Sequence, residues 1–169
     1  MYGEIDLKLV GYTDSSFQSD HDDSKSVSGF IFTLNGGAVC WKSSKQHTVA
    51  DSVCEAEYVA ASDAAKEAVW LRQFISELGV APSLDGLVLL FHDSTGAIAQ
   101  AKEPKAHQQT KHILRRYHLV REIVDCGDVE LQKIDGKENL ADPFTKVISV
   151  KEFNNYKLKM GIRYCTEWF

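Results

Sequence analysis

A short apolar run near the middle of the chain constrains the fold most strongly. Residues 86–92, GLVLLFH, are mostly apolar and are followed directly by Asp93. A run of this length is typical of a strand that is buried on both faces, as strands inside a sheet are. We therefore expect a sheet that holds this strand in its interior.

Three strand-like segments precede this run. Residues 5–13 alternate partly between apolar and polar, residues 26–34 are rich in Val, Ile, Phe and Thr, and residues 38–49 follow an Asn35-Gly36 turn. An Asn-Gly pair between two such segments is a strong signal for a hairpin. The sheet is therefore predicted to begin with antiparallel strands.

Helical patterns fill much of the remaining chain. Ser52, with Glu55 three residues later, matches a capping box, and a long helix is predicted from there to Leu78, before Gly79. The same kinds of signal predict helices over 94–102, 108–126 and 138–149, the last containing Pro143, and a strand over 129–134. The order βββαβααβα predicts one α/β domain over residues 1–149, with residues 150–169 as a C-terminal extension that packs on the domain or trails from it.

Composition narrows the class of protein. The chain has 169 residues, of which 44% are hydrophobic and 25% charged, as is usual for one soluble globular domain. No apolar run approaches the roughly 20 residues of a membrane span, and the first residues lack the pattern of a secretory signal. The four cysteines form no C-x-x-C pair, so reduced structural thiols are expected. We expect an intracellular protein with no membrane partner.

The net charge of −5 disfavours nucleic acid as a partner. However, residues 102–121 contain six cations and one anion, so this segment carries +5 and the rest of the chain −10. The cations are Lys102, Lys105, Lys111, Arg115, Arg116 and Arg121. Two interpretations stay open, namely a solvated surface and a contact with phosphates.

Carboxylates stand where the predicted strands end. Asp14 ends the first predicted strand and Asp93 the fourth, and the predicted order brings these two ends together, where strand termini can open into a crevice. Each aspartate alone is equally consistent with a turn or a helix cap. Asp142, which precedes Pro143, is equally consistent with a helix N-cap.

The long helix distinguishes between its two glutamates. Its apolar positions fall within an arc of roughly 80°; they are Ala60, Ala64, Ala68, Leu71, Ile75 and Leu78. Glu57 lies inside this arc and Glu55 lies on the opposite side. A carboxylate that faces the sheet is costly unless it is paired or binds metal. Glu57 is therefore the predicted functional residue, with Glu55 as the alternative.

The four acids Asp14, Glu57, Asp93 and Asp142 together make an all-oxygen ligand set. Such a set suits Mg²⁺ or Mn²⁺, and no Cys or His pairing suited to zinc accompanies it. The pattern predicts hydrolysis of phosphodiesters with two metal ions.

Several segments in one order resemble the ribonuclease H domain of Pol polyproteins from copia-type LTR retrotransposons. They extend from about Leu9 to about Ser149 and read GYTDSSF, DDSKSVSGF, GGAVCWKSSKQHTVADSVCEAEYVAASDAAKEAVWL, FHDSTGAIAQAKEP, HQQTKHILRRYHLVRE and ENLADPFTK. The resemblance implies a ribonuclease H-like fold, which is a mixed five-stranded sheet of order 3-2-1-4-5 flanked by helices, with its first three strands antiparallel. It also implies that Asp14, Glu57, Asp93 and Asp142 are the catalytic and metal-binding residues.

The activity that the resemblance implies is endonucleolytic hydrolysis of the RNA strand of RNA/DNA hybrids during reverse transcription. It implies two Mg²⁺ ions, for which Mn²⁺ would substitute, and the reverse transcriptase of the same polyprotein as a partner, in a cytoplasmic virus-like particle or in the nucleus. Contacts with the hybrid are expected from Ser15, Ser16, Ser94, Lys102, Lys105, Lys111, His112, Arg115 and Arg116. One alternative is a weak or inactive hybrid-binding module that depends on a fused reverse transcriptase, and another is a related nuclease that acts on DNA duplexes.

Some residues depart from the family pattern. Asp51 and Val53-Cys54 replace apolar and small hydroxyl residues, and Ser94 stands where asparagine is usual. These departures bear on activity more than on fold. His92 is expected to be a packed or hydrogen-bonded histidine rather than a metal ligand.

Overall fold

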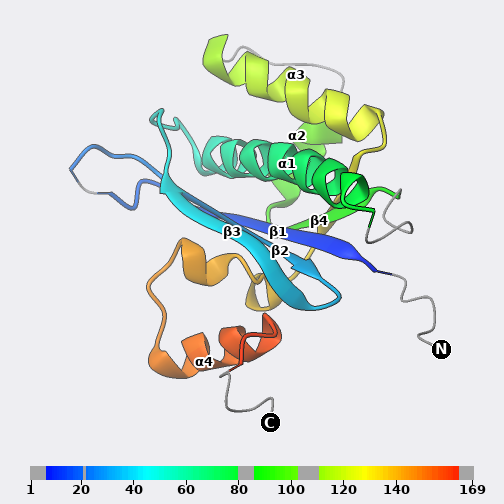
Figure 1. Cartoon of the computed structure of the whole chain (residues 1–169). Helices are drawn as coiled ribbons and strands as arrows, with labels where there is room; N and C mark the ends of the chain where they lie inside the picture. Colours follow the sequence, from blue (N-terminus) through cyan, green and yellow to red (C-terminus); the bar gives the residue numbers. More distant parts are fainter. Residues whose placement is uncertain (1–6, 21, 80–85, 103–110, 164–169) are drawn as a thin grey trace, which may run out of the picture.

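The computed structural model describes residues 7–20, 22–79, 86–102 and 111–163 (Figure 1). In these residues a sheet lies between a layer formed by α1, α2 and α3 and a second layer that contains α4. Parts of three predicted segments lie outside the described residues: residues 5 and 6, 108–110 and 164–169. None of the described helices combines the length and the apolar character that a membrane span requires.

The sheet has five strands in the order β3-β2-β1-β4-β5. The strands are β1 (Leu9–Ser16), β2 (Val27–Leu34), β3 (Gly37–Lys45), β4 (Val88–His92) and β5 (Val129–Lys133). β1, β2 and β3 are antiparallel, whereas β4 pairs in parallel with both β1 and β5. The predicted fold is therefore confirmed, and the apolar strand β4 lies inside the sheet as expected.

The turn between β2 and β3 has the backbone that the sequence predicts. Asn35 and Gly36 both have positive φ, at 50° and 80°. Two such residues in succession twist a two-residue loop to match the strands that it joins.

Helix α1 (Val53–Glu77) covers the sheet with small side chains. Ala60, Ala64 and Ala68 are fully buried in the core with Phe32 and Leu90, so the helix can lie close to the strands. Leu78 was expected on this apolar face but is 55% exposed. The helix ends at Glu77, so Leu78 belongs to the cap that follows it.

The predicted capping box at the start of α1 is half formed. The Ser52 hydroxyl accepts a hydrogen bond from the backbone N–H of Glu55 at 3.2 Å. The Glu55 carboxylate accepts from the N–H of Asp51 rather than from that of Ser52, at 3.1 Å. Glu55 therefore accepts a backbone hydrogen bond at the N-terminus of the helix, from a residue one position earlier than the motif predicts.

The prediction of a helix over residues 138–149 is wrong. The chain forms two short 3-10 helices instead, η2 (Gly136–Glu138) and η3 (Asp142–Phe144). Asn139, which is fully buried, donates from Nδ2 to the carbonyl of Thr13 at 2.9 Å and accepts from the N–H of Ala141 at 3.1 Å. These side-chain bonds compete with a helical hydrogen-bond ladder and tie the segment to β1.

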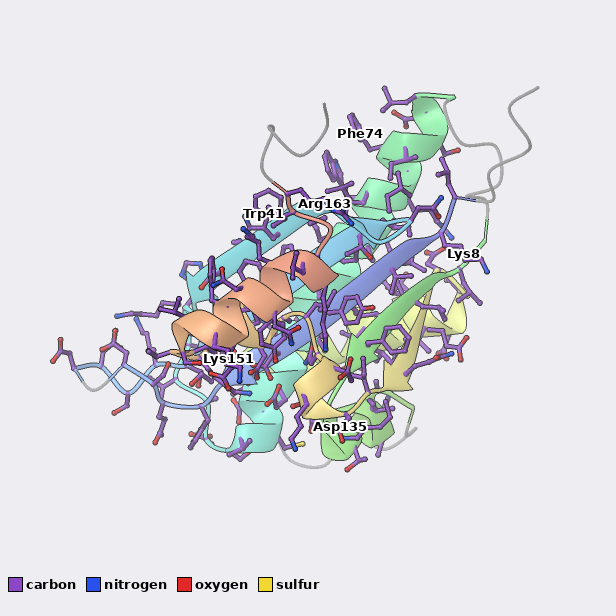
Figure 2. The ribbon with its side chains drawn as sticks, turned by 90° about the horizontal axis from the view of Figure 1, so that it is seen from below. Lys8, Trp41, Phe74, Asp135, Lys151 and Arg163 are labelled. Atoms are coloured by element: carbon purple, nitrogen blue, oxygen red, sulfur yellow. The ribbon has the colours of Figure 1, made fainter. Side chains whose placement is uncertain are left out.

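The C-terminal helix α4 (Val150–Lys159) lies across the opposite face of the sheet from α1 (Figure 1). Ser149 and Glu152 form a capping box at its start, and Tyr156 and Met160 are buried against Ile31. The backbone N–H of Ala38 donates to the carbonyl of Met160 at 2.9 Å. Figure 2 shows this face, with Lys151 near the start of α4 and Trp41 of β3 near its far end. The domain boundary at residue 149 stays a prediction.

The 3-10 helix η3 closes onto β2 at a glycine. A Cβ atom at Gly29 would lie 2.8 Å from both Phe144 Cβ and Thr145 Cγ2. Real contacts of this kind are longer, so only glycine lets η3 approach β2 this closely. Gly29 is also the partner of Asp14 in the register between β1 and β2.

Replacing Asn139 with Ala should destabilise the protein by about 2 to 3 kcal/mol, because Thr13 would lose the partner of its buried carbonyl. Urea unfolding followed by circular dichroism measures this change. Asn154→Ala is the matched control, because Asn154 is exposed on α4, and it should change the unfolding free energy by less than about 0.5 kcal/mol. Equal effects of the two substitutions would contradict the anchoring role of Asn139.

Candidate active site

Two of the predicted acids are brought together by the pairing of β1 with β4. Thr13 is the register partner of His92, and the residues that follow them are Asp14 and Asp93. The predicted adjacency of these aspartates is therefore confirmed. Asp14 does not end its strand as expected, because pairing with β2 continues through Ser16.

Glu57 enters the same place from the second turn of α1. The residue is buried, at 7% exposure, and its carboxylate interacts electrostatically with Asp14 and Asp93. Glu55 is half-buried and bonds to the backbone at Asp51. The geometry thus agrees with the helical phase, which favours Glu57.

Asp142 completes the cluster from η3, and it brings two residues that sequence analysis missed. The Thr145 hydroxyl donates to Asp14 Oδ2, and the Lys146 ammonium pairs with Asp142. Lys146 Nζ also lies 3.4 Å from Asp14 Oδ2. The spacing of three and four residues after Asp142, in the motif ADPFTK, was the signal available in the sequence.

His92 supports the site from beneath. It is fully buried, its Nδ1 accepts a hydrogen bond from the N–H of Ser94 at 3.0 Å, and its Nε2 lies 3.2 Å from the carbonyl of Glu57. With Nδ1 as acceptor, Nε2 carries the proton and donates to that carbonyl. Both ring nitrogens are therefore engaged, as expected of a hydrogen-bonded histidine.

No family model matches the chain. Among curated proteins it is 41% identical over 161 residues to the retrovirus-related Pol polyprotein of transposon TNT 1-94 from Nicotiana tabacum, covering 95% of this chain and 12% of that protein. It is 32% identical to the Pol polyprotein of transposon RE2 from Arabidopsis thaliana, covering 92% of this chain and 11% of that protein. The chain is homologous to copia-type Pol polyproteins. It spans about a tenth of the length of these relatives.

Solved structures that resemble this chain include ribonucleases H. A ribonuclease H1 isolated from compost superposes with a TM-score of 0.60 at 18% identity, covering 82% of this chain and 92% of that one. The same enzyme in complex with an RNA/DNA hybrid gives a TM-score of 0.59 at 18% identity, covering 82% of this chain and 94% of that one. The protease-reverse transcriptase of prototype foamy virus gives 0.56 at 17% identity, covering 85% of this chain and 21% of that one. These likenesses establish the ribonuclease H fold, as the sequence motifs predicted.

Burial dominates the electrostatics of the acidic cluster. It raises the pKa of Glu57 to about 7, and the charges of Asp14 and Asp93 add to this effect against the opposing influence of His92. Burial likewise raises the pKa of Asp14, although Thr145 and Lys146 act against it. By contrast, the neighbouring His92 ring holds the pKa of Asp93 below its ordinary value. Two buried acids, Asp14 and Glu57, interact with each other and with the half-buried Asp93, so a cation there would relieve their repulsion.

The donor set fits a divalent cation. Asp14 Oδ1 and Glu57 Oε2 are buried and have no hydrogen-bond partner among the described residues, although Glu57 Oε2 lies 3.5 Å from His92 Nε2. One potential ligand atom from each of Glu57, His92 and Asp93 lies within 4.8 Å of the others. Because both nitrogens of His92 are engaged, carboxylate oxygens are the available ligands, and these suit Mg²⁺ or Mn²⁺.

The residues expected to contact nucleic acid have different surroundings. Arg115 on α3 (Lys111–Asp125) is exposed, whereas Arg116 Nη1 pairs with Asp63 of α1 at 2.7 Å. Ser15 is buried, Ser16 is half-buried, and the Ser94 hydroxyl accepts from the N–H of Ala97 at the start of α2 (Thr95–Lys102). Lys105 and the side chains of Lys102, Lys111 and His112 lie outside the described residues. The binding roles of all nine residues stay predictions.

The departure at Ser94 leaves the local structure intact. Its hydroxyl caps α2, and the asparagine usual at this position also caps helices well. Asp51 contributes its backbone N–H to Glu55.

The stability of the metal-free protein should fall as the pH rises from about 5 to about 8. A carboxyl whose pKa is higher in the folded protein favours folding while it is protonated, and for Glu57 this contribution is lost between pH 4.5 and about 7. Glu57→Gln should reduce this fall by roughly 2 kcal/mol. Urea unfolding in EDTA across this pH range measures it.

Three further groups, Asp14, His92 and Glu55, act in the same direction as Glu57. Burial raises the pKa of Asp14, and contacts with Asp93 and Glu57 raise that of His92 although burial lowers it. A residual slope is therefore expected in Glu57→Gln. Glu55→Gln is the control; burial raises the pKa of this carboxyl too, but Glu55 is only half-buried, so the substitution should reduce the slope less than Glu57→Gln does. The opposite result for the two glutamates would overturn the choice of Glu57.

Proposed function

We propose that the chain hydrolyses the RNA strand of RNA/DNA hybrids during reverse transcription, with two divalent cations held by Asp14, Glu57, Asp93 and Asp142. The observation that carries this proposal is the pair of buried carboxylate oxygens, Asp14 Oδ1 and Glu57 Oε2, which have no hydrogen-bond partner among the described residues and whose carboxylates interact with each other and with Asp93. Homology to Pol polyproteins and the ribonuclease H fold support it.

Mg²⁺, or Mn²⁺ in its place, would activate the attacking water and stabilise the leaving 3′ oxygen when bound. The chain's own residues hold the ligands in place. Thr145 fixes one oxygen of Asp14, and His92 is packed beneath both Glu57 and Asp93. Because these supports come from η3 and β4, the carboxylates keep their mutual geometry through the reaction.

Arg115 is the residue that we propose binds the phosphates of the substrate. Arg115 is exposed and is free of the ion pair that holds its neighbour Arg116. Contacts of this kind are independent of sequence, and recognition of the RNA strand would rest on its 2′-hydroxyl groups.

A reverse transcriptase region of the same polyprotein is the proposed partner. The chain matches only about a tenth of its Pol relatives, and one structural neighbour is a protease-reverse transcriptase. Such a partner would add substrate affinity to that of this small domain.

Asp14→Asn should lower the rate of RNA cleavage in a labelled RNA/DNA hybrid by roughly a thousandfold, because a carboxylate that would bind and position the cation is lost. Glu57→Gln should have a similar effect, whereas Glu55→Gln should remain near wild type. The assay is run in Mg²⁺ and in Mn²⁺, with DNA duplex and RNA duplex as control substrates.

The outcomes separate the rival functions. Cleavage of DNA duplex in preference to the hybrid would indicate a related DNA nuclease instead. Hybrid binding without cleavage, unchanged by fusion to a reverse transcriptase, would indicate an inactive binding module.

Arg115→Ala should weaken hybrid binding and reduce the slope of log affinity against log salt by about 1, because one phosphate contact is lost. Fluorescence anisotropy at several salt concentrations measures both effects. Arg116→Ala is the matched variant and should change binding by less than about twofold while lowering the unfolding free energy by about 0.5 to 1 kcal/mol. An equal loss of binding in both variants would mean that the Asp63 pair opens to release Arg116 to the substrate.

A further inference from the structure

One lysine lies inside the acidic cluster. The Lys146 ammonium contacts carboxylates from two different elements, Asp142 of η3 and Asp14 of β1. Asp14 is only 1% exposed, and its other oxygen, Oδ1, has no hydrogen-bond partner among the described residues. The ammonium therefore stands next to ligands that the proposed function assigns to a divalent cation.

The local turn fixes this position. The backbone N–H groups of Thr145 and Lys146 both donate to the carbonyl of Asp142, each at 3.1 Å. This turn places the Thr145 hydroxyl and the Lys146 ammonium on the same side as the Asp142 carboxylate, where both reach Asp14. Thr145 is buried, whereas the Lys146 side chain is 43% exposed. The ammonium can therefore move into solvent without unfolding the turn.

The lysine pair on α4 differs in kind. Lys159 pairs with Glu138 at 2.8 Å, but the Glu138 side chain is 62% exposed and belongs to a surface pair. Surface pairs of this type contribute little to stability because water screens both charges. Lys146 neutralises the carboxylate of Asp14, which water scarcely reaches, so removing its charge leaves this buried anion with only the Thr145 hydroxyl to offset it.

We propose that Lys146 is the internal counter-cation of the metal-free centre and that it competes with the divalent cation for Asp14 and Asp142. This inference rests on the proposed function, in which those carboxylates hold metal. The ammonium stabilises the acidic cluster before metal binds, and it withdraws toward solvent when metal arrives. Lys146 thus lowers the metal affinity of the site and keeps the empty site folded.

The test measures binding of Mn²⁺ alone by isothermal titration calorimetry, together with thermal melting in EDTA and in Mn²⁺. Lys146→Met removes the charge and keeps most of the stem. It should bind Mn²⁺ roughly tenfold more tightly than wild type, melt at a lower temperature in EDTA, and show a larger upward shift with Mn²⁺. Lys146→Arg keeps a cation and should stay closer to wild type in all three measurements. Lys146→Gln repeats the test with a polar side chain in case Met perturbs packing.

Lys159→Met is the matched control for net charge. It removes one lysine charge from a surface pair outside the acidic cluster, so it should leave Mn²⁺ affinity within about twofold of wild type. If Lys159→Met and Lys146→Met raise the affinity equally, long-range charge explains the effect and the inference is overturned.

Failure of this inference can be told apart from failure of the proposed function. Mn²⁺ binding to wild type that is unchanged or weaker in Lys146→Met and Lys146→Gln would overturn the competition and leave the metal site standing. Absence of Mn²⁺ binding in wild type and in every variant would overturn both.

Discussion

The parallel pairing of β4 with β1 is the interaction on which the rest of the structure depends. It sets Asp93 beside Asp14, and it creates the buried position from which His92 reaches the backbone of α1. If β4 ran antiparallel to β1, the C-terminal end of β4 would lie beside the start of β1, away from Asp14. Because a parallel pair needs a long crossover, this arrangement also requires the helix that carries Glu57.

The acidic centre is held by groups that differ in how they offset its charge. His92 provides a fixed dipole and a packed surface, Thr145 provides a hydrogen bond to Asp14, and Lys146 provides a full positive charge. His92 comes from β4, whereas Thr145 and Lys146 follow η3, so the centre exists only when β1, β4, α1 and η3 are all in place. The raised pKa values of Asp14 and Glu57 are the energetic mark of this assembly.

The sequence allowed much of this arrangement to be predicted, because strand periodicity and helical phase report burial directly. The apolar run of β4 and the phase of Glu57 on α1 are examples of this kind. The segment after β5 could not be predicted in this way. There the buried bonds of Asn139 outweigh local helix propensity, and they involve Thr13, which is distant in sequence. Lys146 was missed, and the pairing of Arg116 with Asp63 could not be predicted, since tertiary contacts decide which acids these cations pair with.

The glycine at position 29 shows that a working centre needs more than its acids. Any side chain at that position would push η3 away from β2, and with it the hydroxyl and the ammonium that meet Asp14. Such a chain would still contain all four acidic residues in the expected motifs. Surveys that sort related mobile-element copies into intact and decayed by their acidic residues alone would therefore count it as intact. Gly29 belongs beside those residues as a criterion of integrity.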